Sequence, residues 1–395
     1  MKELWQMDKN DAPVWQRKRV IWLFSGCVMI AIILVVGGLT RLNQAGLSIT
    51  EWEVIRGVVP PLSEAKWEEV FETYRQYPEY REIHRGMSLS EFKVIYWWEY
   101  SHRMLSRLLG VLFLLPLLWF VAKRAMPPGD ALKLLGIAAL GGVQAFLGWY
   151  MVQSGLADQP VVSHLRLGIH LVVAFLIFSF LWTMALNRIP GSPSIRKTVQ
   201  PAIDSSEKSA TADRFRNSGM PGRKWLGVNP DIIFGTLLVL LFLQVLVGGW
   251  SAGLKAGYVY PTFPKMGNYW IPPELGFMSP LWYDLTHNAI SVQFLHRLLA
   301  FMVTVLVLFP AIAGLRSGSG PLQRAGLLLI LIITLQITTG ALNVLWGVPV
   351  WLASFHQLGA LMLLTALLTW RYLYTLPGTY KTRQANHAEN IQTIS

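Results

Sequence analysis

Runs of apolar residues long enough to cross a membrane recur along the whole chain, separated by shorter polar stretches. A helix of about 20 apolar residues spans the roughly 30 Å of hydrocarbon in a bilayer. Eight runs meet this requirement, at residues 20–39, 94–121, 133–153, 164–186, 231–251, 288–314, 322–346 and 352–374. The pattern predicts an all-α polytopic membrane protein with eight transmembrane helices.

Composition and charge agree with this class and add an orientation. Only 14% of the residues are charged, whereas 53% are hydrophobic. Lys and Arg concentrate before the first run, as "RKR" at 17–19, and between the fourth and fifth runs, at 188–224. By the positive-inside rule both termini are expected in the cytoplasm. The net charge of +12 then reflects topology and contact with membrane lipid, so we expect no nucleic-acid partner.

The N-terminal segment predicts a bacterial plasma (inner) membrane. Glu3, Asp8 and Asp11 lie in the first twenty residues, and no apolar core precedes the first run. A cleavable signal peptide would have such a core, and a transit peptide would be poor in acids.

The two halves of the chain resemble each other. "YSHRMLSRLLGVLFLLP" from Tyr100 matches "FLHRLLAFMVTVLVLFP" from Phe294, and Gln144/Gly148 recurs as Gln336/Gly340. Because each half has an even number of spans, the pattern predicts a parallel repeat of two pseudo-symmetric four-helix bundles. Chance likeness between apolar helices is the alternative. The predicted division is an N-terminal half at 1–187, a cytoplasmic linker at 188–230, a C-terminal half at 231–376 and a polar cytoplasmic tail at 377–395.

The first outer loop, residues 40–93, is long and rich in aromatic and acidic residues. Its "SLSEF" at 88–92 has the Ser and Glu spacing of a capping box, which predicts a helix N-terminus before a short amphipathic stretch. We expect this loop to form an ordered cap of interfacial helices that partly covers a site.

Four of the eight histidines stand apart from the rest. His102, His170, His296 and His356 each lie in the first third of an even-numbered span, so they are expected at similar depth near the outer face. Polar groups inside a membrane are costly and mark function by default. The predicted ordinary surface residues are His84, His287 and His387. His164 lies at the edge of a span and could be interfacial or a partner of a site.

Two facing histidines per half suit haem iron better than zinc. Zinc usually takes three or four protein ligands, whereas haem needs one or two axial ligands and an apolar slot between helices. Arg103 and Arg297 directly follow two of the histidines and could pair with haem propionates, since guanidinium suits carboxylates. From the residues alone we favour two haem sites, one in each half.

The two predicted sites differ in one residue. Aligning His102 with His296 places Glu99 opposite Gln293. Glu99 shares a helical face with His102 and could exchange protons beside the iron, whereas a glutamine does not titrate. The alternative is that Glu99 only forms a salt bridge to Arg103 or Arg107.

The segments "GGLTRLNQAGLSITEWEVIRGVVPP" (37–61), "EFKVIYWWEYSHRMLSRLLG" (91–110) and "VQFLHRLLA" (292–300) resemble the haem A synthase family, in its alphaproteobacterial and mitochondrial branch. The resemblance covers all eight spans and the first outer loop, but neither the linker nor the tail. It implies oxidation of a methyl group of haem O to a formyl group by successive hydroxylations, which gives haem A for terminal cytochrome oxidases. Some relatives carry a cysteine pair in an outer loop, and Cys27, in the first span, is the only cysteine here.

Residue by residue, the resemblance assigns the two sites. It implies that His102 and His170 bound the site for the substrate haem O, with Glu99 as the acid near the reacting methyl group. His296 and His356 would be axial ligands of a haem b in the C-terminal half. Whether one or both N-terminal histidines ligate haem O stays open. Haem O synthase and an electron acceptor are the implied partners, and homo-oligomer formation is compatible with the sequence.

Two other functions compete with this one. The first is a bis-His cytochrome b that transfers electrons from quinol, which would not need an acid in only one half. The second is a transporter with a parallel repeat, which would place charges near the middle of the bilayer or break its helices. Both the single acid and the position of the polar residues favour the enzyme.

Overall fold

The computed structural model describes residues 12–51, 56–157, 160–189 and 229–376. Within these ranges the chain is helical, without a named strand. Most of the predicted linker, residues 190–228, and the predicted tail, 377–395, lie outside the described residues.

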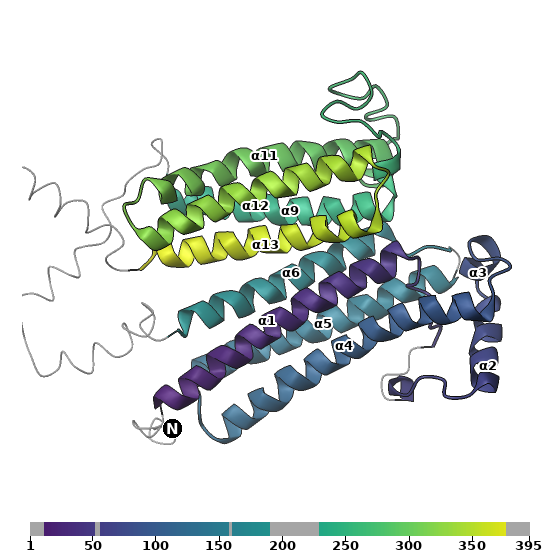
Figure 1. The fold of residues 1–395 in the computed structure, drawn as a ribbon, viewed down its shortest axis with the longest axis horizontal. Coiled ribbons are helices and arrows are strands. Elements are labelled where there is room, and N and C mark those ends of the chain that lie inside the picture. Colours follow the sequence, from purple (N-terminus) through teal and green to yellow (C-terminus); the bar gives the residue numbers. More distant parts are fainter. Residues whose placement is uncertain (1–11, 52–55, 158–159, 190–228, 377–395) are drawn as a thin grey trace, which may run out of the picture.

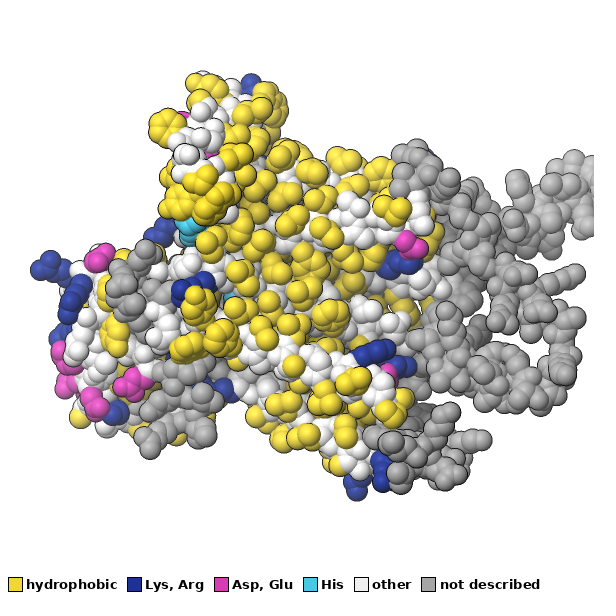
Figure 2. All heavy atoms as spheres, turned by 180° about the vertical axis from the view of Figure 1, so that it is seen from behind, with side chains coloured by type: hydrophobic (Ala, Val, Ile, Leu, Met, Phe, Trp, Pro, Cys, Tyr) yellow, Lys and Arg dark blue, Asp and Glu magenta, His cyan; other side chains and the backbone are white. Residues whose placement is uncertain are grey.

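Eight of the helices are long and apolar enough to cross a membrane, which confirms the eight predicted spans. Their bounds are α1 (Ala12–Leu42), α4 (Leu89–Ala122), α5 (Pro128–Ala157), α6 (His164–Asn187), α9 (Pro230–Gly253), α11 (Ala289–Leu315), α12 (Gly320–Leu345) and α13 (Val350–Tyr374). Hydrophobic side chains cover the middle of the described surface, and charged side chains gather mostly toward its two ends (Figure 2). This distribution is that of a multi-pass membrane protein.

The long helices pack in two groups that follow the chain order. Helices α1, α4, α5 and α6 lie together, and α9, α11, α12 and α13 form the second group (Figure 1). The groups meet where α6 packs against α9 and α13, and where α1 packs against α13. Gly168 and Gly249 bring α6 and α9 close, since a Cβ on Gly249 would lie 2.7 Å from the Cα of Gly168.

Shorter helices extend one end of the molecule, which we call the cap end. Helices α2 (Glu64–Arg75) and α3 (Pro78–Glu82) belong to the cap, defined as the described part of residues 43–88. The cap encloses its own aromatic core with the start of α4. Members of this core are Ala45, Trp67, Phe71, Tyr74, Phe92, Ile95 and Tyr96. The prediction of an ordered helical cap is therefore confirmed.

The predicted capping box is present, but the helix that it begins differs from the prediction. The Ser88 side chain accepts from the Glu91 backbone N–H, and the Glu91 carboxylate accepts from the Ser88 N–H at 2.8 Å. The helix that starts there is α4 itself, rather than a separate amphipathic segment. The membrane helix is continuous with the cap because no breaking residue stands between Leu89 and the apolar run.

The segment between α9 and α11 is held by one buried carboxylate in α10 (Leu281–His287). Asp284 accepts hydrogen bonds from the backbone N–H groups of Gly276 and Met278, both at 3.0 Å, and from Asn288 Nδ2 at 2.9 Å. Ser291, in the first turn of α11, also donates to it. Burial alone would raise the pKa of Asp284, but these hydrogen bonds outweigh it and lower the pKa to about 2. The loop is thereby fixed to the start of α11.

Candidate functional site

The four singled-out histidines lie on the four long helices that begin at the cap end. His102 is on α4, His170 on α6, His296 on α11 and His356 on α13. These helices run in the same direction, and each histidine stands in the half of its helix nearer the cap end. The four histidines therefore lie toward the same end of the bundle, as the sequence predicts, and the position of this end at the outer face stays a prediction.

Each of these histidines faces a glycine on a neighbouring helix. A Cβ atom on Gly37 of α1 would lie 2.8 Å from Nε2 of His102, and one on Gly148 of α5 would lie 3.4 Å from Cε1 of His170. In the second group, a Cβ on Gly248 of α9 would lie 3.0 Å from Cε1 of His296. A Cβ on Gly340 of α12 would lie 2.9 Å from Cε1 of His356. A side chain at Gly37, Gly248 or Gly340 would therefore crowd the imidazole, whereas Gly148 lies at an ordinary contact distance from His170.

Three of the four histidines also have a glutamine beside their Nε2 atom. The amide nitrogen of Gln144 lies 3.1 Å from Nε2 of His170. Gln244 lies 3.4 Å from that of His296, and Gln336 lies 3.5 Å from that of His356.

Each glutamine stands four residues before the facing glycine, so both lie on one helical face. Gln144/Gly148 and Gln336/Gly340 are visible in the sequence alignment of the halves. The pair Gln244/Gly248 was missed, although the same spacing would have revealed it. Ile33 occupies the corresponding position before Gly37, so the site of His102 departs from the pattern.

The C-terminal pair has the separation of two imidazoles that share one metal. The ring centroids of His296 and His356 are 6.4 Å apart, with the planes at 75°. Two metal–imidazole bonds of about 2 Å each, plus the two ring radii, come to about 6 Å.

The polar atoms around the histidines fit a bound haem. Among the described residues no group of three or more His, Cys, Asp or Glu side chains could hold a metal ion, which leaves pairs of histidines. Nδ1 of His170 and of His296 is buried without a hydrogen-bond partner, and so is Oε1 of each neighbouring glutamine. Unsatisfied buried atoms are rare in native proteins and call for an explanation, which a bound group at these sites would provide.

Glu99 is buried and held by the cap. Only 3% of its surface is exposed. Its Oε2 accepts from Ser48 Oγ at 2.7 Å and from the Ile49 N–H at 2.9 Å, and its Oε1 accepts from Arg103 Nη2 at 2.6 Å. The salt bridge to Arg103 that the alternative interpretation expected is therefore present. It does not explain why two further donors from residues 48 and 49 converge on the same carboxylate.

Arg103 and Arg297 have matching roles in their two groups. Arg103 donates to the carbonyl oxygens of Ile49 at 2.8 Å and Glu51 at 3.1 Å. Arg297 donates to those of Tyr260 and Lys265, both at 3.1 Å. Each arginine thus anchors the loop beside its histidine, which holds the guanidinium at the cap end of the site. Propionate binding by either arginine stays a prediction.

Gln293, opposite Glu99 in the alignment, is also buried but has a different partner. Only 3% of its surface is exposed, and its Nε2 donates to the Tyr260 carbonyl at 3.2 Å. No carboxylate takes the place of Glu99 at this position. The chemical difference between the two sites that the sequence indicated is therefore retained in the fold.

Two histidines predicted to be ordinary surface residues are not. Nδ1 of His84 lies 2.7 Å from the Tyr74 hydroxyl, inside the cap. His287 stacks on Tyr283 with ring centroids 4.0 Å apart, and its ring meets His164 edge-on at 5.0 Å. His164 Nε2 also lies 2.8 Å from the Thr286 carbonyl, so α6 is linked to α10. Their sequence context was polar, and the contacts join segments far apart in the chain. His387 lies outside the described residues.

The chain is similar over most of its length to one family of known proteins. Residues 20–368 match the family model described as cytochrome oxidase assembly protein. The haem A synthase of Nitrosospira multiformis is 42% identical over 359 residues, which cover 89% of this chain and 92% of the relative. That of Chelativorans sp. is 41% identical over 94% of each chain, and that of Rhodospirillum centenum is 40% identical over 92% of this chain and 90% of the relative.

Proposed function

This chain belongs to the family of cytochrome oxidase assembly proteins that includes the haem A synthases, and on that premise we propose that it oxidises a methyl group of haem O to a formyl group. The product, haem A, would serve a terminal cytochrome oxidase. The enzyme is an oxidoreductase that acts within a membrane, which suits a lipophilic substrate with a long isoprenoid tail.

The observation that carries this proposal is the unequal chemistry of two otherwise similar sites. Both groups of helices present two histidines that face glycines, and both place an arginine after one of them. Among the described residues, only the N-terminal group places a buried carboxylate, Glu99, three residues before the histidine on the same helix, where the C-terminal group has Gln293. A protein that only passed electrons between two equal haems would have no use for a proton-exchanging group on one side.

We assign the substrate to the N-terminal site and a resident haem b to the C-terminal one. His102 and His170 would bound haem O, and His296 and His356 would ligate the haem b. The 6.4 Å separation of the C-terminal rings and the unpartnered Nδ1 of His296 support the second assignment. When bound, the haem b would supply electron transfer between the substrate site and an electron acceptor.

The protein's own residues would orient the substrate and move protons. Glu99 is held by Ser48, Ile49 and Arg103, so its carboxylate has a fixed place on the helical face of His102. There it would take up or release protons at the substrate site while oxygen replaces hydrogen on the methyl group. Arg103 and Arg297, at the cap end, would bind propionates in addition to the loop carbonyls that they hold.

The wider arrangement follows the same proposal. Two pseudo-symmetric halves, 1–187 and 231–376, would lie in the bacterial inner membrane with both termini and the segment 188–230 in the cytoplasm. The recurring glycine–histidine contacts support the repeat. Haem O synthase would deliver the substrate, an electron acceptor would complete the reaction, and a homo-oligomer is compatible with it.

The haems that the protein produces distinguish the proposed enzyme from an electron-transfer cytochrome. The chain is expressed together with a haem O source, and the haems extracted from the membranes are separated by chromatography. We expect haem A and its hydroxylated intermediate in addition to haem O and haem b. Membranes that contain the folded protein and haem O but neither oxidised product would overturn the assignment and favour an electron-transfer cytochrome.

Ligation is tested separately by spectroscopy. We expect His296→Ala and His356→Ala to abolish the low-spin b-type spectrum, whereas His102→Ala should leave it in place. A spectrum that survives both C-terminal substitutions would show that these two histidines are not the ligands.

A further inference from the structure

A chain of three polar side chains crosses the interior of the cap. The Tyr74 hydroxyl donates to Oε2 of Glu79 at 2.9 Å and lies 2.7 Å from Nδ1 of His84. Tyr74 is 0% exposed and Glu79 is 4% exposed. Two of the three groups are therefore sealed from water among the aromatic residues of the cap.

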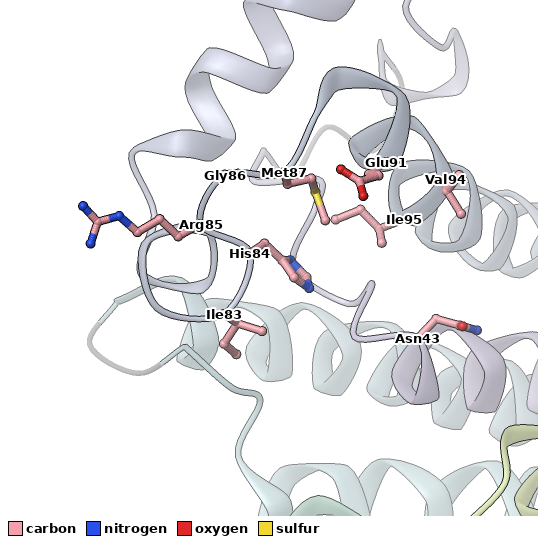
Figure 3. Close-up of a pocket in the computed structure, with 9 residues that line it drawn as sticks. All are labelled: Asn43, Ile83, His84, Arg85, Gly86, Met87, Glu91, Val94 and Ile95. Carbon is pink, nitrogen blue, oxygen red and sulfur yellow. The ribbon is translucent and has the colours of Figure 1, made fainter.

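One end of this chain opens to the surface. His84 lines an open pocket of about 520 Å³ together with Asn43, Met87, Glu91 and Ile95. In Figure 3 the His84 imidazole points into this pocket, whereas Arg85 points away from it. Partial burial lowers the pKa of His84, so the ring is neutral near pH 7 and can carry its proton on either nitrogen.

The other end of the chain is the buried acid Glu79. Glu79 has no salt-bridge partner among the described residues. Tyr74 from α2 is hydrogen-bonded to it, His84 from the segment after α3 lies on the other side of the Tyr74 hydroxyl, and the charge of Glu99 from α4 acts on it. Burial raises the pKa of Glu79 to about 8, with the charge of Glu99 adding to the effect and the Tyr74 hydrogen bond opposing it. Glu79 can therefore gain or lose a proton near neutral pH.

The three groups can pass a proton without moving. The Tyr74 hydroxyl has one proton and two hydrogen-bond partners, so it can donate either to Glu79 or to His84. When His84 Nδ1–H donates to Tyr74 and Tyr74 donates to Glu79, a proton taken up at Nε2 of His84 lets both bonds shift. Nδ1 then gives its proton to the Tyr74 oxygen, and Tyr74 gives its own to the Glu79 carboxylate. One proton enters from the pocket, and one neutralises Glu79.

The pocket and Glu99 are also joined through the start of α4. Ile95 lines the pocket and lies one helical turn before Glu99. Ser48 Oγ lies 3.5 Å from the Ile95 carbonyl and donates to Glu99 at 2.7 Å. Both oxygens of Glu99 accept hydrogen bonds from protein groups, and Ser48 links the carboxylate to the turn of α4 that lines the pocket.

From this geometry we propose that His84, Tyr74 and Glu79 form a proton relay from the open pocket of the cap to the buried acid Glu79, inside the cap that holds Glu99. The inference rests on the proposed function, in which Glu99 serves the oxidation of haem O. Protonation of Glu79 removes a negative charge from the interior of the cap, which also holds the Glu99 carboxylate through Ser48 and Ile49. The relay residues act through Glu99 and do not touch the substrate.

The test compares variants that remove one proton-carrying group at a time. Haem A formation is measured against pH, in H₂O and in D₂O, for Tyr74→Phe, Glu79→Gln and His84→Ala. Proton transfer by a positioned group contributes about 10²-fold or more, so we expect at least a roughly tenfold loss for each variant. Tyr74→Phe combined with Glu79→Gln should be no slower than either alone, because both interrupt the same route. Added imidazole should restore the His84→Ala variant but not the Glu79→Gln variant.

The control is Tyr80→Phe, which removes a hydroxyl from the same aromatic cluster, where the Tyr80 ring lies 5.9 Å from that of Tyr74. It should keep the wild-type rate and pH profile. Melting temperature and the b-type spectrum report whether each variant folds. If folded Tyr74→Phe and Glu79→Gln variants match the wild type in rate, pH profile and isotope effect, the relay is wrong while the enzyme stands. A wild-type chain that makes no haem A overturns the proposed function and the relay with it.

Discussion

The carboxylate of Glu99 and the guanidinium of Arg103 form a buried salt bridge, with Oε1 and Nη2 2.6 Å apart, one turn apart on α4. The same two residues hold the cap: Glu99 accepts from Ser48 and Ile49, and Arg103 donates to the Ile49 carbonyl. One pair therefore joins the histidine-bearing helix to the loop above it. A substitution in either residue acts on the chemistry and on the cap together, so the two effects must be separated.

The first prediction concerns the carboxylate. Glu99→Gln keeps the shape of the side chain and reproduces the amide found at Gln293, but it removes the group that exchanges protons. We expect haem A formation to fall by about 10²-fold to 10⁴-fold, the range for loss of a general acid or base, while haem O still accumulates in the membrane. The measurement is the haem A to haem O ratio by chromatography. Glu69→Gln, at an exposed position on α2, is the matched control, and an equal loss in both variants would argue against a chemical role for Glu99.

A second prediction separates stability from chemistry in the same pair. Arg103→Ala leaves Glu99 buried without its cation, which costs about 3–5 kcal/mol when one partner of a buried ion pair is removed. We expect a lower melting temperature in detergent. Adding Glu99→Gln should recover part of the loss, since no uncompensated charge remains. If the double variant is as unstable as the sum of the single variants, the two residues are not coupled.

The facing glycines give a third prediction. A Cβ on Gly248 or Gly340 would come within 3.0 or 2.9 Å of an imidazole carbon, so Gly248→Ala and Gly340→Ala should displace the rings. The expected result is a lost or altered low-spin spectrum, with destabilisation of about 1–3 kcal/mol from overpacking. Gly235→Ala on the same helix α9 is the control, because no heavy atom lies within 4 Å of its Cβ. An unchanged spectrum in both site variants would contradict the proposed position of the haem.

The fourth prediction is a pH dependence of stability. Burial and the charge of Glu99 raise the pKa of Glu79 from 4.5 to about 8, despite the Tyr74 hydrogen bond. Between these values the folded state keeps a proton that the unfolded state releases. The contribution of Glu79 to stability is therefore complete below about pH 4.5 and is lost as the pH rises toward about 8.

This dependence can be measured as the melting temperature of the detergent-solubilised protein from pH 5 to pH 9. We expect a decline in the wild type that is clearly smaller in Glu79→Gln. Parallel curves for the two proteins would show that Glu79 does not titrate in this range.

Much of the arrangement follows from local pattern. The eight spans are readable because length and apolar composition decide membrane insertion, and the faces of His102 and Glu99 follow from the period of a single helix. The likeness between the halves also located the four site histidines, and the unequal pair Glu99/Gln293 is visible in one alignment.

What faces these residues was decided only by the tertiary structure. The periodicity of a single helix does not predict that Gly37 faces His102 or that His84 contacts Tyr74 across the cap. Nor does it predict that Ser48 and Ile49 donate hydrogen bonds to Glu99. His84 therefore looked like a surface residue, and Gln244 escaped notice among apolar neighbours. The physical reason is that helical periodicity fixes which side chains share a face, whereas partners from distant segments are chosen by how helices and loops pack, and that packing leaves no regular spacing in the sequence.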